Sequence, residues 1–160
     1  MKEDSLNEQV GILTRREIEA RILKPFYEAV SQELGEDRAK EILKSIVIDE
    51  AKKIGASMRE RADNDSVTAF ASQWEPWFRG GALEIEELES TESTWRFNVT
   101  RCRYAEMYRE LGMAELGATL SCNRDAALVE GYSDHIAFKR TQTLMQGASC
   151  CDFEYKKMDR

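Results

Sequence analysis

The feature that most constrains the fold is a change of hydrophobic period after the pair Gly80-Gly81. Before this pair, apolar residues recur every three or four positions, as they do on one face of a helix. After it, residues 82–89 and 93–100 alternate between apolar and polar side chains, which is typical of strands with one buried face. Helices and strands that are separated along the chain in this way indicate an α+β domain.

The first half of the chain is predicted to be helical. Thr14 and Glu17 have the spacing of a capping box, and Gly35 stands where a glycine commonly ends a helix. A second helix is expected over 36–62, and a shorter, aromatic-rich one over 66–78. The first helix has an apolar residue at every fourth position: Ile18, Ile22, Phe26 and Val30.

The second half is predicted to add two strand pairs and two helical stretches. The first pair is a hairpin that turns at residues 90–92, and the second pair comprises residues 135–145 and 151–157. Between them, a helix over 103–111 precedes a helical stretch over 114–130 that is interrupted near residue 120. The expected architecture is α+β, with an antiparallel sheet of about four strands covered by helices and a helical N-terminal half.

Length and charge limit the organisation and the partners. A chain of 160 residues predicts a single domain over 1–160, with residues 1–13 as a loose arm. The 23 Lys and Arg residues against 30 Asp and Glu residues argue against nucleic acid and anionic membranes as main partners. The chain has no run of about 20 apolar residues and no secretory signal, so we expect a cytoplasmic protein. Association into a homo-oligomer stays open.

The four cysteines and the single histidine exclude several kinds of site. The cysteines stand at positions 102, 122, 150 and 151, with no C-x-x-C pair, and cytoplasmic thiols are normally reduced. His135 alone cannot form a His-rich metal site. The chain also lacks the glycine-rich loops of nucleotide-binding proteins and the signatures of zinc proteases and serine hydrolases.

The last third of the chain carries four segments that resemble a known family. They are Arg101-Cys-Arg-Tyr-Ala105, Ser121-Cys-Asn-Arg-Asp125, the stretch from Arg140-Thr141 to Gly147, and Cys151-Asp-Phe-Glu-Tyr155. In this order they are similar to the R-C-x-Y-A, S-C-x-x-D, R-T-x-T-x-x-x-G and C-D-F-x-[YF] segments of the L-2-amino-thiazoline-4-carboxylic acid hydrolase family. The resemblance covers about residues 95–157.

This resemblance implies a reaction. Members of the family open a five-membered cyclic isothiourea by hydrolysis and form S- or N-carbamoyl cysteine. One position departs from the family pattern, because Cys150 stands where relatives often have a histidine, and a thiol is a poorer base near neutral pH. The family positions that map onto this chain are Arg101, Cys102, Tyr104, Cys122, Asp125, Arg140, Thr141, Gly147, Cys151, Asp152 and Phe153.

The chemistry of these residue types fits hydrolysis of an amidine. A cysteine thiolate is a strong nucleophile, and we expect the adjacent Arg101 and Arg124 to lower the pKa of Cys102 and Cys122. Asp125 stands three residues after Cys122, so both side chains can face one pocket and the carboxylate can hold an amidinium. The candidate catalytic residues are Cys122, Asp125, Cys102 and Cys151. The candidate substrate-binding residues are Arg101, Tyr104, Thr141 and Arg140, which is expected on a strand as a clamp for a substrate carboxylate.

Other interpretations of the same residues stay open. Free cysteines are often simply buried in a core. Cys102, Cys122 and Cys151 can alternatively converge on zinc, as the cysteines do in 4-vinyl-reductase-type domains, which the family distantly resembles. The protein would then be a non-catalytic small-molecule-binding or sensor module. We expect no cofactor, with zinc as the alternative. Arg140 has Glu130 or Asp152 as alternative ion-pair partners, and Asp125 has a helix cap as an alternative role.

Overall fold

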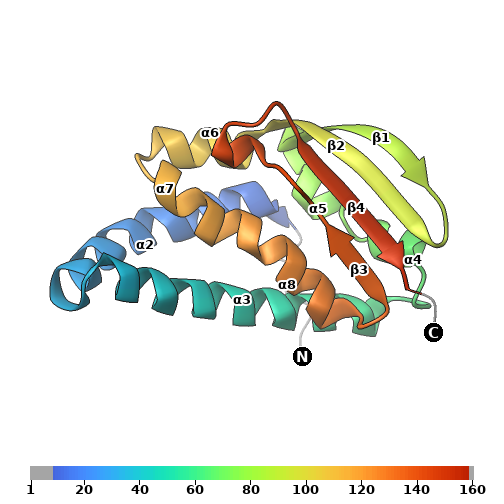
Figure 1. Ribbon diagram of the computed structural model, residues 1–160, viewed down its shortest axis with the longest axis horizontal. Coiled ribbons are helices and arrows are strands. Elements are labelled where there is room, and N and C mark those ends of the chain that lie inside the picture. The colour runs from blue at the N-terminus through green and yellow to red at the C-terminus, as the bar shows by residue number, and fades with distance from the viewer. Residues whose placement is uncertain (1–8, 159–160) are drawn as a thin grey trace.

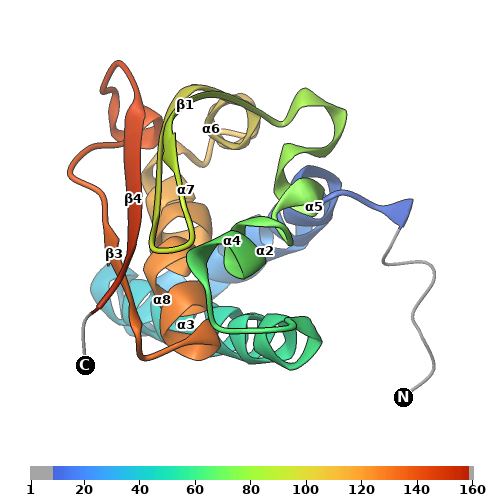
Figure 2. The same cartoon turned by 90° about the vertical axis from the view of Figure 1, so that its right-hand side faces the viewer.

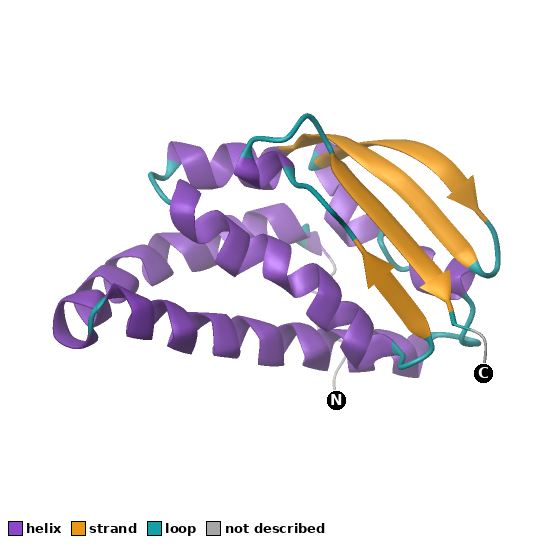
Figure 3. Ribbon diagram, in the orientation of Figure 1, coloured by secondary structure: helices purple, strands orange, loops and turns teal. Residues whose placement is uncertain are grey.

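The computed structural model describes residues 9–158 and has an α+β architecture, as predicted. Figure 1 shows a four-stranded antiparallel sheet beside a group of helices, and Figure 3 shows the two kinds of element as separate parts. The strand order is β1-β2-β4-β3. In the view of Figure 2, the helices lie on one face of the sheet. The strands are β1 (Leu83–Ser90), β2 (Thr94–Cys102), β3 (Ile136–Lys139) and β4 (Cys151–Lys157).

Two long helices make up the N-terminal half. Helix α2 (Ile12–Leu34) and helix α3 (Glu36–Arg61) form a hairpin that turns at Gly35, whose φ of 84° is readily adopted only by glycine. The predicted capping box is wrong, because α2 begins at Ile12 and no side chain caps it. Ile12 is buried against Ala82 and Tyr104, and this packing extends the helix by two residues ahead of Thr14.

The apolar stripe of α2 at Ile18, Ile22, Phe26 and Val30 is mostly exposed. Ile18, Ile22 and Phe26 are 61%, 71% and 61% exposed, whereas the buried residues of this helix are Ile12, Arg16 and Ala20. Residues two positions apart on a helix point in nearly opposite directions, so the stripe that includes Ala20 faces inward and the stripe that includes Ile18 and Ile22 faces out. Helix α2 therefore has apolar side chains on both of these faces.

The aromatic segment forms two short helices and the centre of the core. Helix α4 (Val67–Ala71) is capped by Ser66, whose Oγ accepts a hydrogen bond of 3.0 Å from the Ala69 amide, and helix α5 (Glu75–Phe78) follows it. Trp74 is 2% exposed, and its ring makes an edge contact with Trp95 at 5.4 Å between centroids. The aromatic residues of this segment thus pack against the sheet, where Tyr155 and Phe97 are fully buried.

In the last strand pair, β4 has the predicted bounds, but β3 is shorter than predicted. Strand β3 ends at Lys139, residues 140–143 are irregular, and a short turn of 3₁₀ helix follows at Leu144–Gln146. The amides of Thr141 and Gln142 both donate to Asp152 Oδ1 at 2.9 Å. A side chain thus satisfies backbone donors that would otherwise have to pair with a neighbouring strand.

The central helices follow the predicted order. Helix α6 (Arg103–Glu110) is followed by α7 (Ala114–Gly117), a π-helical turn (Ala118–Cys122) and α8 (Asn123–Tyr132). The predicted interruption near residue 120 corresponds to the π-helical turn, across which the helical path continues. Such turns often occur at functional sites.

Helices α3 and α8 approach each other closely at two glycines. A Cβ atom added to Gly55 would lie 2.0 Å from the carbonyl oxygen of Leu128, and one added to Gly131 would lie 2.1 Å from the carbonyl oxygen of Lys52. Both obstacles are backbone atoms, which cannot rotate away as a side chain can. The backbone contact therefore depends on glycine at both positions.

Only part of the predicted N-terminal arm can be compared with the structure. Residues 1–8 lie outside the described residues. Ile12 and Leu13 belong to α2, and Ile12 is buried, so this end of the predicted arm is part of the fold. Over residues 9–158, none of the helices combines the length and the apolar character needed to cross a membrane.

We predict that Gly131→Ala lowers the free energy of unfolding by about 1–3 kcal/mol, because the added methyl group forces α8 away from α3. Helix propensity alone would favour alanine by about 1 kcal/mol, so the sign of the change is informative. Urea unfolding measures it. The control is Ala56→Gly on the exposed side of α3, where only helix propensity should act and cost about 1 kcal/mol. A stabilised Gly131→Ala protein would contradict the close contact.

Candidate functional site

Five of the residues singled out by the sequence lie together at the start of α8. Cys122 ends the π-helical turn, Asp125 lies in the first turn of α8, and Arg140 follows the end of β3. Cys102 is the last residue of β2, and Cys151 is the first residue of β4. These five residues, here called the Cys-Asp-Arg cluster, include one or more from each of the four motif segments. Their charges act on one another, since Asp125 raises the pKa of each of the three thiols.

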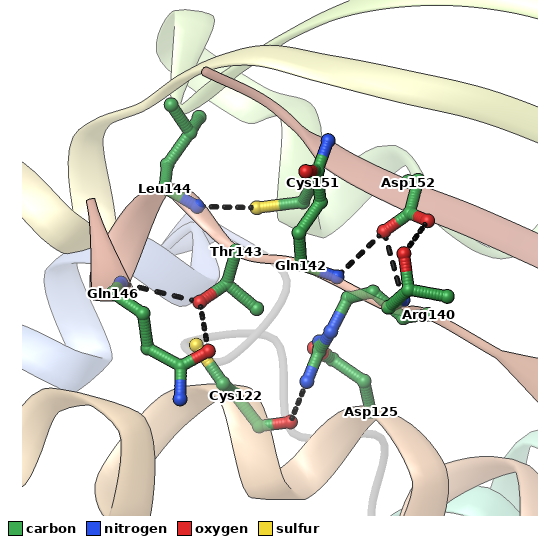
Figure 4. A network of polar contacts seen from close by, with 10 residues as sticks. Cys122, Asp125, Arg140, Gln142, Thr143, Leu144, Gln146, Cys151 and Asp152 are labelled. Carbon is green, nitrogen blue, oxygen red and sulfur yellow. Dashed lines mark hydrogen bonds and ion pairs between the residues drawn. The ribbon is translucent and has the colours of Figure 1, made fainter. Parts of the chain in front are cut away.

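Arg140 connects the parts of the cluster. Its Nη1 donates to Asp125 Oδ2, and its Nη2 donates to the carbonyl oxygen of Cys122 at 3.2 Å (Figure 4). The guanidinium also lies over the rings of Phe138 and Phe153, at 5.5 and 5.3 Å from their centroids. The side chains of Arg140 and Asp125 are only 14% and 20% exposed. The ion pair is therefore held in a largely dry environment.

The position of Arg140 corrects the expectation of a strand-borne clamp. The strand has already ended, and the guanidinium binds a carboxylate of the protein itself. The alternative partners are also wrong, because Glu130 pairs with Lys52 at 2.9 Å and Asp152 holds the loop at Thr141 and Gln142. The partner is Asp125, which therefore anchors an arginine and does not serve as a helix cap.

Burial raises the pKa of Asp125 from 3.8 to about 6, although Arg140 acts to lower it. Desolvation penalises the charged carboxylate and outweighs the attraction of the guanidinium. A carboxyl group with this pKa can both accept and donate a proton near neutral pH, which suits a general acid or base.

The cysteine thiols differ from the expectation. Burial and the Asp125 charge raise the pKa of Cys122 to about 12, and burial raises the pKa of Cys151 to about 11 and also that of Cys102. The predicted lowering by neighbouring arginines is therefore wrong. Arg124 binds the carbonyl oxygen of Leu120 and the carboxylate of Glu19, and Arg101 pairs with surface carboxylates.

The loop between β3 and β4 is held by Asp152. The Gln142 amide donates to Asp152 Oδ1 at 2.9 Å (Figure 4). The Thr141 amide donates to the same oxygen, and the Thr141 hydroxyl donates to Asp152 Oδ2 at 2.5 Å. These hydrogen bonds outweigh burial and hold the pKa of Asp152 below its ordinary value. Gln142 donates to the thiol of Cys150 at 3.0 Å. Thr141, predicted to bind substrate, is thus placed as an anchor of the loop that carries Arg140.

Two other predicted substrate-binding residues have partners in the protein. Arg101 is half-exposed and pairs with Glu106 at 2.8 Å and with Glu84 at 3.3 Å. Tyr104 is buried, and its hydroxyl donates to the carbonyl oxygen of Trp77 at 3.1 Å. The structure therefore brings Arg140 into the cluster and places Arg101 on the surface.

Tyr155 is a candidate that the sequence analysis did not identify. Its hydroxyl is fully buried, and among residues 9–158 it has no hydrogen-bond partner. The charges of Asp125 and Arg140 act on this hydroxyl, which places it near the cluster. Tyr155 lies two residues after Phe153 on β4, so both side chains point to the same face of the sheet. The alternation of side chains within the last motif segment is the sequence signal that could have identified Tyr155.

The three thiols do not form a ready-made metal site. Within the described part of the chain, no group of three or more Cys, His, Asp or Glu side chains is arranged to hold a metal ion. The donor set of Cys102, Cys122 and Cys151 therefore does not fit zinc in the geometry found here, although thiolates are the ligands that zinc prefers.

Comparison with known proteins identifies the family. The family model of L-2-amino-thiazoline-4-carboxylic acid hydrolase matches residues 15–155. The chain belongs to this family. The match covers both the helical first half and the four motif segments, so all residues of the Cys-Asp-Arg cluster lie within the family region. Among curated proteins, none matches the chain.

Two solved structures show a distant similarity to this family member. One is the phenol-responsive sensory domain of the transcription activator PoxR with phenol, 11% identical over 85% of this chain and 73% of the other, with a TM-score of 0.47. The other is trafficking protein particle complex subunit 3 from Naegleria fowleri, covalently bound to palmitic acid, 6% identical over 89% and 96%, with a TM-score of 0.49. At these values, neither similarity extends to function.

We predict that Asp125 titrates near pH 6 in the folded protein. Its folded pKa lies above the ordinary value of 3.8, so the stability that it contributes is fully present below about pH 4 and is lost as the pH rises through about 6. Urea unfolding of the wild type and of Asp125→Asn between pH 4 and pH 7 tests this. The stability of the wild type relative to the variant should fall as the pH rises, and a rise would show that the Arg140 charge outweighs burial.

We predict slow alkylation of Cys122 in the native protein. A thiol with a pKa of about 12 is almost entirely protonated at pH 7, and only the thiolate reacts. Mass spectrometry after iodoacetamide treatment should show Cys122 labelled more slowly than in the same protein unfolded in urea, which serves as the reference. Native labelling faster than in urea would contradict the effect of burial.

Proposed function

We propose that the protein is a hydrolase that opens a small cyclic amidine or isothiourea, such as 2-amino-thiazoline-4-carboxylate, at the Cys-Asp-Arg cluster. The observation that carries the proposal is the convergence of side chains from four separate segments on one partly buried site. Membership of the hydrolase family supports the reaction class. The substrate, the nucleophile and the roles below are part of the proposal.

Asp125 is the proposed acid–base group. Its carboxylate pairs with the cationic amidinium of the substrate, and its raised pKa of about 6 allows it to take up and return a proton near neutral pH. Arg140 orients the carboxylate through their ion pair and fixes the start of α8 through the Cys122 carbonyl. In this proposal Arg140 is a positioning residue, because its guanidinium is already engaged by the protein.

Cys122 is the proposed nucleophile, and the substrate itself assists its activation. The resting thiol is protonated, but a cationic amidinium beside it would favour the thiolate and oppose the effect of burial. The thiol proton moves to Asp125 while sulfur bonds to the amidine carbon. Asp125 then protonates the ring heteroatom that leaves, and water hydrolyses the covalent intermediate. The buried Tyr155 hydroxyl would gain a hydrogen-bond partner in a bound substrate.

A second candidate function is small-molecule binding without catalysis. The raised pKa values of the three thiols favour it, because they argue against a nucleophile that is active at rest. In that case, the cluster would hold a ligand through the Asp125–Arg140 pair. The two functions differ in whether a bound amidine is turned over.

We predict that Cys122→Ser loses nearly all turnover of 2-amino-thiazoline-4-carboxylate while it still binds the compound, because a hydroxyl is too weakly acidic to form the nucleophile. Ring opening and calorimetric binding measure the two effects. Asp125→Asn should lose turnover and weaken binding, since it removes the charge that pairs with the amidinium. The matched control is Cys150→Ser, a neighbouring thiol that contacts Gln142 outside the cluster and should keep wild-type rates.

Each alternative predicts a different result in this assay. If the wild type binds a cyclic amidine but opens none, the protein is a binding module. If Cys122→Ser keeps wild-type rates while Asp125→Asn does not, Asp125 activates water directly and Cys122 is structural. Stoichiometric zinc in the purified protein, measured by elemental analysis, would replace the thiol mechanism with a metal-centred one.

A further inference from the structure

A cavity lies between α2 and α3, away from the Cys-Asp-Arg cluster. Helices α2 and α3, with Arg124 of α8, line this partly open cavity of about 280 Å³, whose wall is mainly aliphatic and aromatic. No residue of the cluster lines it. The volume is close to the lower end of the range of about 300–1,000 Å³ that is typical of ligand pockets. The cavity therefore has its own chemistry, which the proposed hydrolysis does not use.

The cavity is long and narrow. On α2 its wall extends from Ile12 to Val30, and on α3 from Ile54 to Ala39. Eighteen residues of helix span about 27 Å, which is the length over which this modest volume is distributed. Such a shape suits a single unbranched chain better than a compact ring system.

Two buried arginines lie toward one end of this cavity. Arg16 is 5% exposed, and the side chain of Arg124 is 13% exposed. Both bind the same carboxylate, since Arg16 Nη1 lies 2.8 Å and Arg124 Nη2 lies 3.4 Å from Glu19 Oε2. The other acidic residue of the wall, Glu50, pairs with Lys53 at 2.6 Å. Two largely buried guanidinium groups thus share one carboxylate, that of Glu19, whose side chain is 41% exposed.

The ionisation of Arg124 supports an excess of positive charge there. Burial, together with the repulsion of Arg16, lowers the pKa of Arg124 to about 10, although Glu19 acts to raise it. An anionic group placed beside these two arginines would relieve this repulsion. The end of the cavity near Arg16 and Arg124 therefore favours an anion.

The opening of the cavity exposes apolar side chains. Phe26 and Ile46 line it from opposite helices and are 61% and 54% exposed. Ile22 lies one turn before Phe26 on α2 and is 71% exposed. Large exposed apolar side chains that gather at one place commonly mark a binding surface. A hydrocarbon chain that enters between α2 and α3 would cover Phe26 and Ile46.

From these observations, we propose that the cavity between α2 and α3 binds a single-chain carboxylate amphiphile. Its carboxylate lies at Arg16 and Arg124, and its hydrocarbon chain extends toward the turn at Gly35. The shape selects an unbranched chain, the arginines select an anionic head, and the apolar walls supply the contact area. Occupancy of this site is independent of whether the cluster is catalytic.

The probe is laurate, an unbranched C12 carboxylate, titrated by isothermal calorimetry below its micelle concentration. We expect saturable binding of one laurate per chain, with affinity rising by about fourfold for each methylene between C6 and C12. Dodecanol and dodecyltrimethylammonium are chain-matched controls for the head group, and both should bind at least tenfold more weakly than laurate. Cys122→Ser should bind laurate like the wild type, because this cysteine does not line the cavity.

Two variants distinguish the contribution of the laurate carboxylate from that of its hydrocarbon chain. Arg124→Gln should weaken laurate about tenfold or more and leave dodecanol unchanged, since it removes a charged donor but not the apolar wall. Ala39→Leu places a larger side chain in the far end of the cavity and should weaken laurate more than hexanoate. The matched control is Ala29→Leu on the exposed side of α2, which does not line the cavity and should leave both affinities unchanged. Circular dichroism confirms that each variant is folded.

Four results would overturn the proposal. They are the absence of laurate binding to the wild type, equal affinities for laurate and dodecyltrimethylammonium, an unchanged laurate affinity in folded Arg124→Gln, and an unchanged preference for laurate over hexanoate in folded Ala39→Leu. Light scattering measures the oligomeric state as a further check. A homodimer that buries Phe26 and Ile46 and binds no laurate would show that a second copy of the chain covers this face.

Discussion

The backbone contact between α3 and α8 is the constraint on which both sites depend. Gly55 and Gly131 allow the two helices to approach until backbone faces backbone, and Lys52 and Glu130 add an ion pair of 2.9 Å beside the contact. Helix α8 also leads into β3 and hence to the loop that carries Arg140. The distance between α3 and α8 therefore fixes where the start of α8 lies with respect to the sheet.

Two consecutive residues of α8 point into different sites. Arg124 lines the cavity between α2 and α3, and Asp125 pairs with Arg140 on the side of the sheet. Neighbouring residues on a helix point about 100° apart, so one helix can present a cation to one site and a carboxylate to the other. Arg16 and Arg124 also act on Asp125 and lower its pKa, against the larger effect of burial. The two sites are thus electrostatically connected within the core.

Burial, more than neighbouring charge, decides the ionisation of these groups. The sequence places Arg101 beside Cys102 and Arg124 two positions after Cys122, which suggested activated thiols. In the folded chain, both arginines bind other partners, and desolvation raises the pKa of the thiols. We therefore expect these thiols to react slowly with alkylating agents unless a cationic ligand beside them favours the thiolate.

Local sequence patterns predicted the class of the fold and pointed to the five residues of the cluster, together with others that lie elsewhere. The change of period after Gly81 located the boundary between long helices and strands, because alternation and helical spacing are local properties of the chain. The four motif segments contain Cys102, Cys122, Asp125, Arg140 and Cys151. The family match over residues 15–155 includes all four segments.

Which helix faces are buried and which charges are paired depends on the packing of remote segments. Helix α2 is apolar on two sides, so its sequence could not tell whether the side of Ala20 or that of Ile22 would be buried, and packing against α3 and α6 made that choice. Likewise, the sequence offered several acidic residues as ion-pair partners for Arg140. The fold selected Asp125, because the turn after β3 and the start of α8 meet in space while Asp152 is occupied by the loop amides. Ion pairs and burial depend on distances between remote segments, which no local pattern encodes.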